Sequence, residues 1–400
     1  MDELIRYAKK IAMRTLLTPV KLCPVKKDRV LLVNGLSKKY AGSPRTVAEG
    51  LEEMYPGKFE IVMAVHDPSA YSHLTKRGIK VVKFNSPAYF FYSLTCKVFL
   101  TNSGGFSYLP IRKKQYVINT WHGGGAYKKC GTDMYNDSAL FRKDLRLQGN
   151  HTSTFLSSCR RFTEEVSRAM LVPKEVFWEI GLPRNDMMIR GNEQLRREVR
   201  EKIGLKEGEK LILFAPTYRK INDNYFKDSV AISYGVDTKR VCAAMEQRFG
   251  GKWRFAMRYH PCVVNRGDME DMGVMDLTDY EDMQELLLAA DAMINDFSSS
   301  MWDFMMTGRP SFLFAVDLDH YVTTTEVYTP VAEWPFPQSV NNDELEKTIL
   351  EFDEEKYAAA CKRHYESLGG CETGKATQLV CQRIYEQCFG VKADGAEGKA

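Results

Sequence analysis

No run of apolar residues in this 400-residue chain approaches the roughly 18 that a membrane-spanning helix needs. An excess of one charge is missing too, because 56 Lys and Arg against 52 Asp and Glu leave a formal net charge of +4. Nucleic-acid-binding proteins carry a strong basic excess, so the composition argues against a nucleic-acid partner. No signal-peptide pattern opens the chain, and we therefore expect a cytoplasmic protein.

The motifs of several common sites are also lacking. The ten cysteines contain no Cys-x-x-Cys pair, which predicts reduced thiols rather than disulfides or a zinc site. Neither G-x-x-x-x-G-K followed by Ser or Thr nor G-x-G-x-x-G occurs, which excludes a P-loop and a dinucleotide site of the usual kind. No acidic cluster demands a metal, so we expect no tightly bound metal or cofactor. The sequence carries no signal for an oligomeric state.

What the chain does contain is a regular alternation of short apolar runs and helical stretches from residue 29 onward, the pattern of parallel α/β sheets. A length of 400 residues with 44% hydrophobic side chains is enough for two such domains. The charged stretch 192–210 places their boundary near 185–195. The predicted strands are 30–33, 59–65, 79–84, 97–101, 116–120 and 176–180, then 211–215, 253–259, 292–295 and 311–314. The predicted organisation is an N-terminal segment at 1–28, Rossmann-type domains at 29–190 and 191–390 with helices over 343–389, and a flexible tail at 391–400.

The N-terminal segment departs from the near-neutral balance of the whole chain. Residues 1–29 hold eight basic and three acidic side chains, a local surplus of +5. Apolar residues recur at helical spacing between them: Leu4, Ile5, Ala8, Ile11, Ala12 and Leu16. Such a basic amphipathic helix either lies on an anionic membrane surface or packs on its own domain with solvated lysines.

Two histidines follow predicted strands. Trp121-His122 is followed by Gly123, Gly124 and Gly125, whose backbone can approach an anion closely, while an imidazole can accept a proton near pH 7. At the end of the predicted strand 253–259, strand alternation places Arg258 and His260 on one face, about 6–7 Å apart. This spacing suits two side chains that bind the oxygens of one phosphate. The alternatives are a structural histidine in the first case and a solvated strand edge in the second.

Further polar groups lie at other strand ends. Ser298 and Ser299 precede a predicted helix that carries Asp303, an arrangement that offers N–H groups to an anion or forms an ordinary helix cap. Pro216, Thr217 and Arg219 follow another strand, and Arg184 lies at the hinge, positions where such side chains are usually solvated. Two doubly wound domains facing each other would gather these groups at one cleft, which favours a ligand with more than one phosphate.

In this order the segments resemble the CDP-glycerol:poly(glycerophosphate) glycerophosphotransferase family, the teichoic-acid primases and polymerases. The resemblance covers roughly residues 28–350 and rests on five motifs: Trp121-His122-Gly123, Gly181–Asp186, Ala215–Arg219, Arg258–Pro261, and Asp296-Phe297-Ser298-Ser299 with Asp303. Two departures stand out. Gly124-Gly125 replaces the Thr-Pro of many members, and Phe297 replaces the usual Tyr.

The resemblance implies a GT-B-like α/β fold with an acceptor domain followed by a domain that binds CDP-alditol. It implies that CDP-glycerol is contacted by residues 121–125, Arg184, Pro216, Thr217, Arg258, His260, Ser298, Ser299 and Asp303. Joined to the chemistry above, it predicts transfer of glycerol phosphate from CDP-glycerol to a hydroxyl of a lipid-linked acceptor, with CMP released. His122 would be the general base, and His260 with Arg258 would stabilise charge on phosphoryl and leaving-group oxygens.

The same residues also fit other activities. The same site would also suit CDP-ribitol as the donor, which would make the protein a ribitol-phosphate transferase. A nucleotide-sugar glycosyltransferase would keep the fold but attack carbon, and a family member that binds nucleotide without turnover is a third reading. A lipid-linked acceptor lies at the membrane, where the basic segment 1–28 would be attracted to anionic lipid. We therefore expect peripheral attachment to the cytoplasmic face of the cell membrane.

Overall fold

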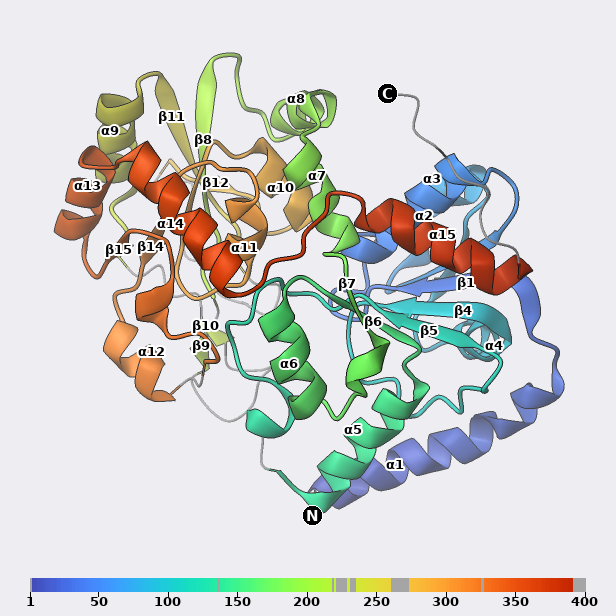
Figure 1. Cartoon of the computed structure of the whole chain (residues 1–400). Coiled ribbons are helices and arrows are strands. Elements are labelled where there is room, and N and C mark those ends of the chain that lie inside the picture. The colour runs from blue at the N-terminus through green and yellow to red at the C-terminus, as the bar shows by residue number, and fades with distance from the viewer. Residues whose placement is uncertain are drawn as a thin grey trace. The chain divides into compact units, whose positions relative to one another are not determined.

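The computed structural model describes residues 2–134, 137–217, 219–220, 229–230, 235–259, 273–324 and 327–390, which form two compact units (Figure 1). Unit 1 contains the residues up to His122, Lys129–Asp186 and the chain from Cys371 onward. Unit 2 contains Gly123–Lys128 and Met187–Gly370. The units therefore differ from the predicted domains in two places, because a short segment after His122 belongs to unit 2 and the last helix belongs to unit 1.

Unit 1 is built on a seven-stranded sheet in the order β3-β2-β1-β4-β5-β6-β7, with every neighbouring pair parallel. Apolar runs predict six of these strands and miss β6, in which only Phe155 and Leu156 are apolar. The strands are β1 (Lys26–Val33), β2 (Glu60–Val65), β3 (Lys80–Lys83), β4 (Cys96–Thr101), β5 (Tyr116–Asn119), β6 (Thr154–Ser157) and β7 (Phe177–Glu179). The helices are α1 (Asp2–Leu17), α2 (Gly42–Met54), α3 (Ser72–Lys76), α4 (Pro87–Thr95), α5 (Ala139–His151), α6 (Arg160–Ala169) and α15 (Ala376–Phe389).

Both faces of this sheet are buried, which explains why its central strand reads as a continuous apolar run. Val30 and Leu32 of β1 point to a core shared with α2 and α15. Leu31 and Val33 point to the opposite core, which α4 covers. Figure 1 shows α15, in red, lying beside α2, although more than 300 residues separate them. Helix α15, from the C-terminal part of the chain, therefore helps α2 to cover one face of the unit 1 sheet.

The strand order of unit 1 contains a topological switch point. From β1 the chain proceeds outward to β2 and β3, then crosses to β4 on the other side of β1. The loops that follow β1 and β4 therefore diverge at the carboxyl edge of the sheet. Doubly wound sheets bind ligands in the crevice that such diverging loops leave.

Unit 2 is built on a six-stranded sheet in the order β12-β11-β8-β13-β14-β15, again with parallel neighbours. Its switch point lies between β8 and β13. The strands are β8 (Glu209–Phe214), β11 (Lys252–Met257), β12 (Met275–Asp276), β13 (Ala292–Asn295), β14 (Ser311–Phe314) and β15 (Gln338–Ser339), with a separate antiparallel pair β9 (Arg219–Lys220) and β10 (Ser229–Val230). The helices are α7 (Asp186–Arg190), α8 (Glu193–Lys202), α9 (Thr238–Phe249), α10 (Met283–Ala289), α11 (Ser300–Met305), α12 (Leu318–Thr324), α13 (Asn342–Leu350) and α14 (Glu354–Ser367).

Helix α1 confirms the predicted N-terminal helix and packs on unit 1 beside α5 (Figure 1). Lys10 forms an ion pair with Asp144 at 2.6 Å, and Arg14 donates to the carbonyl oxygens of Ser107 and Leu109. Basic residues of the segment that are bound within the unit include Lys10, Arg14, Lys26 and Arg29, the last two through Glu60. The six apolar residues of the predicted stripe face away from α5 and are exposed.

Within the described residues, no helix is both long enough and apolar enough to cross a membrane. The nine cysteines in that part of the chain are all free thiols, which agrees with the predicted reduced state. Cys262 lies outside the described residues.

Candidate functional site

His122 lies in unit 1, three residues beyond the end of β5, in a loop that the backbone holds tightly. The side-chain oxygen of Asn119 accepts the N–H of Trp121 at 2.9 Å, and Trp121 takes a left-handed backbone with φ of 53°. The indole of Trp121 then stacks on the imidazole, with ring centroids 4.6 Å apart. A non-glycine residue in this conformation is uncommon, and it forms a sharp turn of the backbone immediately before the histidine.

The hydrogen bonds of His122 determine which of its nitrogens carries the proton. Nδ1 lies 2.9 Å from the carbonyl oxygen of Asn102, and a carbonyl can only accept, so Nδ1–H is the donor. Burial lowers the pKa of His122 to about 4, with the bond to Asn102 opposing and the charge of Arg184 adding to that effect. The imidazole is therefore neutral near pH 7, and its Nε2 carries a lone pair. That is the state a general base requires.

Arg184 is close to His122, but not in the way the sequence suggests. It lies in a buried turn, η5 (Pro183–Asn185), and its guanidinium donates to the backbone carbonyl oxygen of His122 at 2.6 Å. In unit 1 it holds the histidine loop in place. The contact with a substrate phosphate stays a prediction.

The rest of the Gly181–Asp186 motif fastens the C-terminal segment to unit 1. Glu372 accepts from the N–H of Leu182 at 3.0 Å and from the side chain of Asn185 at 2.8 Å. Asp186 accepts the N–H groups of Ala376 and Thr377 at the start of α15. Gly181, with φ of 84°, leaves room for Glu372, whose carboxylate would lie 2.3 Å from an added Cβ. Much of this motif is thus explained by packing.

The triple glycine belongs to unit 2, where Trp302 explains two of its members. A Cβ on Gly124 would lie 2.0 Å from the indole Cδ1 of Trp302, and one on Gly125 would lie 2.9 Å from the same ring. Trp302 is fully buried in α11. A threonine at 124 cannot coexist with this indole, which gives a physical reason for the departure from the family pattern. Gly123 lies beside Ser299, 3.1 Å from its hydroxyl oxygen if a Cβ is added.

The loops after β8 and β13 meet at the switch point of unit 2 through Thr217 and Asp296. Asp296 is fully buried and accepts the N–H of Thr217 at 2.9 Å and its hydroxyl at 2.8 Å. The preceding Pro216 is buried. The hydroxyl proton of Thr217 is therefore directed at Asp296, so a substrate would find only the oxygen lone pairs of this side chain.

The serines after β13 bond mainly to one another. The hydroxyl of Ser300 lies 3.0 Å from that of Ser298, and the carbonyl of Ser298 accepts from Asn295. Ser299 occupies the N-cap position of α11 without a side-chain capping bond, so the expected ordinary cap is not formed by this residue. Asp303 is buried and accepts from Gln284 of α10 at 3.0 Å, which ties the two helices together.

Phe297, the second departure from the family pattern, is fully buried in the same loop. Its ring stacks on Tyr321 of α12, with centroids 3.6 Å apart and an interplanar angle of 6°. The aromatic ring at this position therefore packs the loop, and the hydroxyl of the usual tyrosine is not needed for that contact.

Arg258 follows β11 instead of lying within it. The strand ends at Met257, one residue before Arg258, so β11 is shorter than the predicted strand 253–259. That Arg258 and His260 share a face stays a prediction, because His260 lies outside the described residues. Its N–H bonds to the carbonyl of Phe214 and its guanidinium donates to the carbonyl of Tyr280 at 3.1 Å. Burial lowers the pKa of Arg258, with the charge of Asp282 opposing. The Nε of Arg258 is buried and makes no hydrogen bond within the described residues.

The side chains of two predicted site residues are not among those described. His260 lies outside the described residues, and of Arg219 only the backbone in β9 is described. The structure thus gathers Trp121, His122 and Arg184 in unit 1. In unit 2 it places Thr217, Arg258 and Ser298–Ser299 after three adjacent strands, β8, β11 and β13. Within the part of the chain described, no group of three or more His, Cys, Asp or Glu is arranged to hold a metal ion.

Sequence reasoning missed Asn102 and Asp296 as organisers of these loops. Asn102 holds His122 by its carbonyl, while its side chain bonds to Gly35 and Asn34 after β1. The available signal was position, since an Asn and an Asp each follow the last residue of a predicted strand. Polar side chains at such strand ends often connect neighbouring loops.

Comparison with known proteins decides the family. The model described as CDP-Glycerol:Poly(glycerophosphate) glycerophosphotransferase matches residues 16–386. The chain belongs to this family. It is 26% identical to a teichoic acid glycerol-phosphate transferase of Staphylococcus aureus over 362 residues, 87% of this chain and 90% of that protein. It is 25% identical over 376 residues to a teichoic acid poly(glycerol phosphate) polymerase of Staphylococcus epidermidis, and spans about half (51%) of that protein's length.

The structure of this family member is similar to that of the wall teichoic acid polymerase TagF. A TagF variant soaked with CDPG superimposes with a TM-score of 0.82 at 24% identity, covering 97% of this chain and 98% of that one. This likeness confirms the predicted GT-B-like α/β fold.

Proposed function

We propose that this protein is a CDP-glycerol glycerophosphotransferase of teichoic acid or related cell-surface polymer synthesis. It transfers glycerol phosphate from CDP-glycerol to a hydroxyl of a lipid-linked acceptor or of a growing poly(glycerol phosphate) chain, and it releases CMP. Family membership supports this reaction class. A second supporting fact is that a relative of similar length is itself named a glycerol-phosphate transferase.

The observation that carries the proposal is the neutral His122 with its lone pair on Nε2. The acceptor hydroxyl oxygen attacks the β-phosphorus of CDP-glycerol and forms a new phosphodiester bond. The bond from that phosphorus to the bridging oxygen breaks, and this oxygen leaves with CMP. The hydroxyl proton passes to Nε2 of His122 as its oxygen attacks.

Unit 2 is the proposed donor-binding part. The groups after β8, β11 and β13 include the half-buried Arg258, which has room to neutralise charge on a phosphate. We assign the same task to His260 and to the N–H groups near Ser298 and Ser299. Trp121, Gly123–Gly125, Arg184, Pro216, Thr217, Arg219 and Asp303 complete the proposed contacts with CDP-glycerol. No metal or cofactor is required by this scheme.

A second donor is supported by relatives named for ribitol phosphate, one of which matches nearly the whole chain. The chain is 23% identical over 381 residues to a teichoic acid ribitol-phosphate primase of Bacillus spizizenii, 91% of this chain and 92% of that protein. CDP-ribitol presents the same diphosphate with a longer polyol, so the chemistry at His122 would be unchanged. A donor assay must therefore include CDP-ribitol.

We also propose that the protein binds the membrane peripherally through α1. Leu4 and Leu16 are 62% and 72% exposed, and with Ile5 and Ile11 they form one face of the helix. That face is opposite the one that Lys10 and Arg14 attach to unit 1. Lys9 is exposed on α1, and Lys21 and Lys27 are exposed in the chain that follows it, so the segment offers positive charge to anionic lipid.

The test is a donor comparison. Purified protein with a lipid-linked glycerophosphate acceptor would receive CDP-glycerol, CDP-ribitol or a UDP-sugar in parallel, and CMP or UDP release and product length would be measured. We expect CMP release and chain extension with CDP-glycerol. Preference for CDP-ribitol would identify that compound as the donor in place of CDP-glycerol. Transfer from UDP-sugars alone would overturn the proposed reaction.

A further inference from the structure

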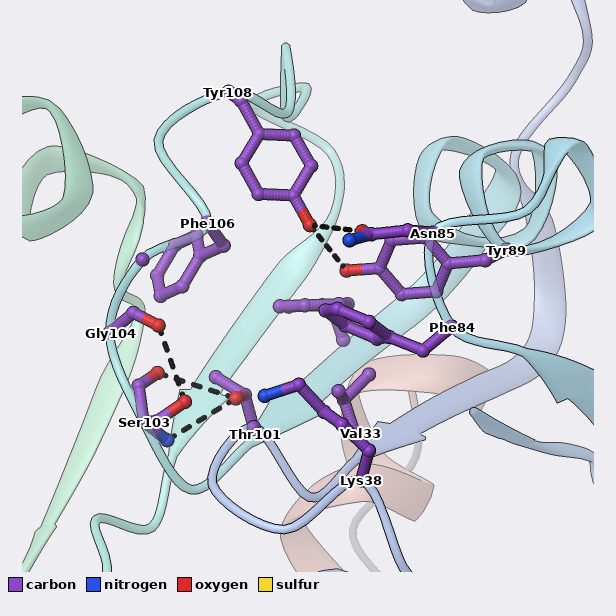
Figure 2. A pocket seen from close by; sticks show the side chains of 13 residues that line it. Val33, Lys38, Phe84, Asn85, Tyr89, Thr101, Ser103, Gly104, Phe106 and Tyr108 are labelled. Atoms are coloured by element: carbon purple, nitrogen blue, oxygen red, sulfur yellow. Dashed lines mark hydrogen bonds between the residues drawn. The ribbon is translucent and has the colours of Figure 1, made fainter. Parts of the chain in front are cut away.

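Unit 1 contains a cavity of about 270 Å³ that the donor chemistry does not use (Figure 2). It opens where β1 and β4 end, between the loops that carry Lys38 and Ser103, and the segment 84–89 forms another wall. Ligand pockets for drug-sized molecules measure about 300–1,000 Å³. A cavity just below that range fits a small head group.

The position of this cavity is the switch point of the unit 1 sheet. Its residues come from the ends of β1 and β4, the adjacent strands from which the chain runs in opposite directions. Ligands of doubly wound sheets bind in this crevice because the diverging loops leave it open. The topology therefore supports a binding site independently of the side chains.

Lys38 supplies the charge of the cavity. Its ammonium lies 4.8 Å from the centroid of the Phe84 ring, and Figure 2 shows it pointing into the pocket toward Thr101. The side chain is half-buried, and no described carboxylate forms an ion pair with it. Burial lowers the pKa of Lys38 accordingly. A buried cation without a counter-charge is costly, so an anion entering here is favoured.

The backbone holds Lys38 in this orientation. Its φ of 55° is left-handed, which is uncommon for a side chain with a Cβ. Its N–H bonds to the carbonyl of Asn34 at 2.9 Å, and its carbonyl accepts from His66 at 2.7 Å. Strained conformations that the surroundings enforce are concentrated at ligand sites.

The remaining walls combine aromatic rings with hydroxyl and amide groups. Phe84 and Phe106 present rings, and Tyr89 bonds to Tyr108 through their hydroxyls at 3.0 Å (Figure 2). Tyr108 also lies within 3.4 Å of the Asn85 side-chain oxygen. Such walls pack against carbon atoms of a ligand and hydrogen-bond its hydroxyls.

The cavity is joined to the proposed base by a single residue. Asn102 lies between Thr101 and Ser103, both of which line the pocket, and its carbonyl accepts from His122. The side chain of Asn102 accepts the N–H of Gly35, another lining residue, at 2.7 Å. A ligand in the cavity and the imidazole are thus held by the same short loop.

We propose that this cavity binds the phosphate-bearing end of the acceptor, a polyol phosphate or a sugar phosphate, with its phosphate on Lys38 and its carbon skeleton against Phe84 and Phe106. The proposal rests on the proposed transferase function and assigns the acceptor subsite of that reaction. Occupation of the cavity would place an acceptor hydroxyl within unit 1, on the side of the base.

A binding experiment tests the proposal without turnover. Amide NMR shifts of Thr101, Ser103 and Gly105 would be followed while sn-glycerol 3-phosphate, N-acetylglucosamine 1-phosphate, inorganic phosphate or glycerol is added to the whole protein. We expect one of the two phosphate esters to bind with a Kd below about 10 mM, and more tightly than phosphate or glycerol. The tighter ester identifies the acceptor end. The proposal is overturned if neither ester binds or if inorganic phosphate binds equally well.

Matched variants make the test specific. Lys38→Met should weaken binding of the ester by about tenfold or more, Lys38→Arg should restore most of it, and Phe84→Leu should weaken it while Lys58→Met, at an exposed lysine, should not. Thermal melting checks that each variant folds. Equal binding by Lys38→Met and the wild type would contradict the proposal.

Kinetics separates this subsite from the function on which it rests. Lys38→Met should raise the KM for the acceptor by about tenfold and leave the KM for CDP-glycerol unchanged. If the wild type releases no CMP with any acceptor, the proposed function fails, while the NMR titration still decides the cavity. If turnover is normal in Lys38→Met, the cavity assignment fails and the function stands.

Discussion

The imidazole Nδ1 of His122 lies 2.9 Å from the carbonyl oxygen of Asn102, and this one contact sets the chemistry of the histidine. It places the ring proton on Nδ1 and leaves Nε2 as an acceptor. The side chain of Asn102 is in turn fixed by Gly35 and Asn34. The loops after β1 and β4 therefore orient a group that follows β5.

The first prediction concerns this protonation state. Nitrogen NMR of the ligand-free protein at pH 7 should show His122 neutral with its proton on Nδ1, and a pKa near the value of about 4 against 6.5 for an ordinary histidine. Because the unfolded chain binds this proton at higher pH than the folded one, the free energy of unfolding should fall as pH drops from about 6.5 towards 4. Exposed His73 serves as the control histidine. A protonated His122 at pH 7 would contradict the assignment.

The second prediction concerns the glycine at 124. Gly124→Ala forces a Cβ to within 2.0 Å of Trp302, so it should destabilise the protein by about 1–3 kcal/mol or more. Gly123→Ala is the matched control, because its Cβ would meet the Ser299 side chain no closer than 3.1 Å, at the hydroxyl oxygen. Denaturant unfolding measures both. In a double-mutant cycle, Trp302→Leu should remove most of the extra cost of Gly124→Ala. Additive costs would mean that the indole is not the cause.

The third prediction concerns the switch point of unit 2. Thr217→Val removes the hydroxyl that bonds to buried Asp296 and should lower the free energy of unfolding by about 1.5–3 kcal/mol. Thr217→Ser keeps the hydroxyl and should cost less. Chemical denaturation compares the two variants, and a Thr217→Val variant as stable as the wild type would contradict the role of this hydrogen bond.

The fourth prediction concerns the exposed face of α1. The double variant Leu4→Glu with Leu16→Glu should lose most sedimentation with vesicles that contain phosphatidylglycerol, because it places charge on the apolar face. The thermal midpoint should stay unchanged, since both side chains are exposed. The double variant Lys58→Met with Lys76→Met, at lysines exposed elsewhere on unit 1, lowers the net charge by the same amount and is the control. Unchanged vesicle binding in the α1 variant would rule out this face.

Much of the fold follows from the sequence because buried parallel strands read as apolar runs. The run Val30–Val33 and its counterparts predict ten strands, and the strand ends then point to His122 and Thr217. Strand β6 escapes the same reasoning, since only two of its residues are apolar. The assignment of α15 to unit 1 depends on contacts with α2 that no local pattern encodes.

Which residues contact a substrate stays a prediction, but the structure adds contacts that spacing along the chain does not reveal. The guanidinium of Arg184 donates to the His122 carbonyl, and one carboxylate oxygen of buried Asp303 accepts from Gln284. Lys38 carries no motif and gains its significance only from the cavity around it. Long-range contacts decide such roles, and spacing along the chain does not contain them.

The central claim is that Nε2 of His122 takes the proton of the acceptor hydroxyl. Its most direct test is single-turnover CMP release from CDP-glycerol with a saturating lipid-linked acceptor, compared between wild type and His122→Ala. The account predicts a rate loss of about 10²- to 10⁴-fold in the variant, with the Kd for CDP-glycerol nearly unchanged and the His73→Ala control at the wild-type rate. Near-normal CMP release by His122→Ala would contradict it.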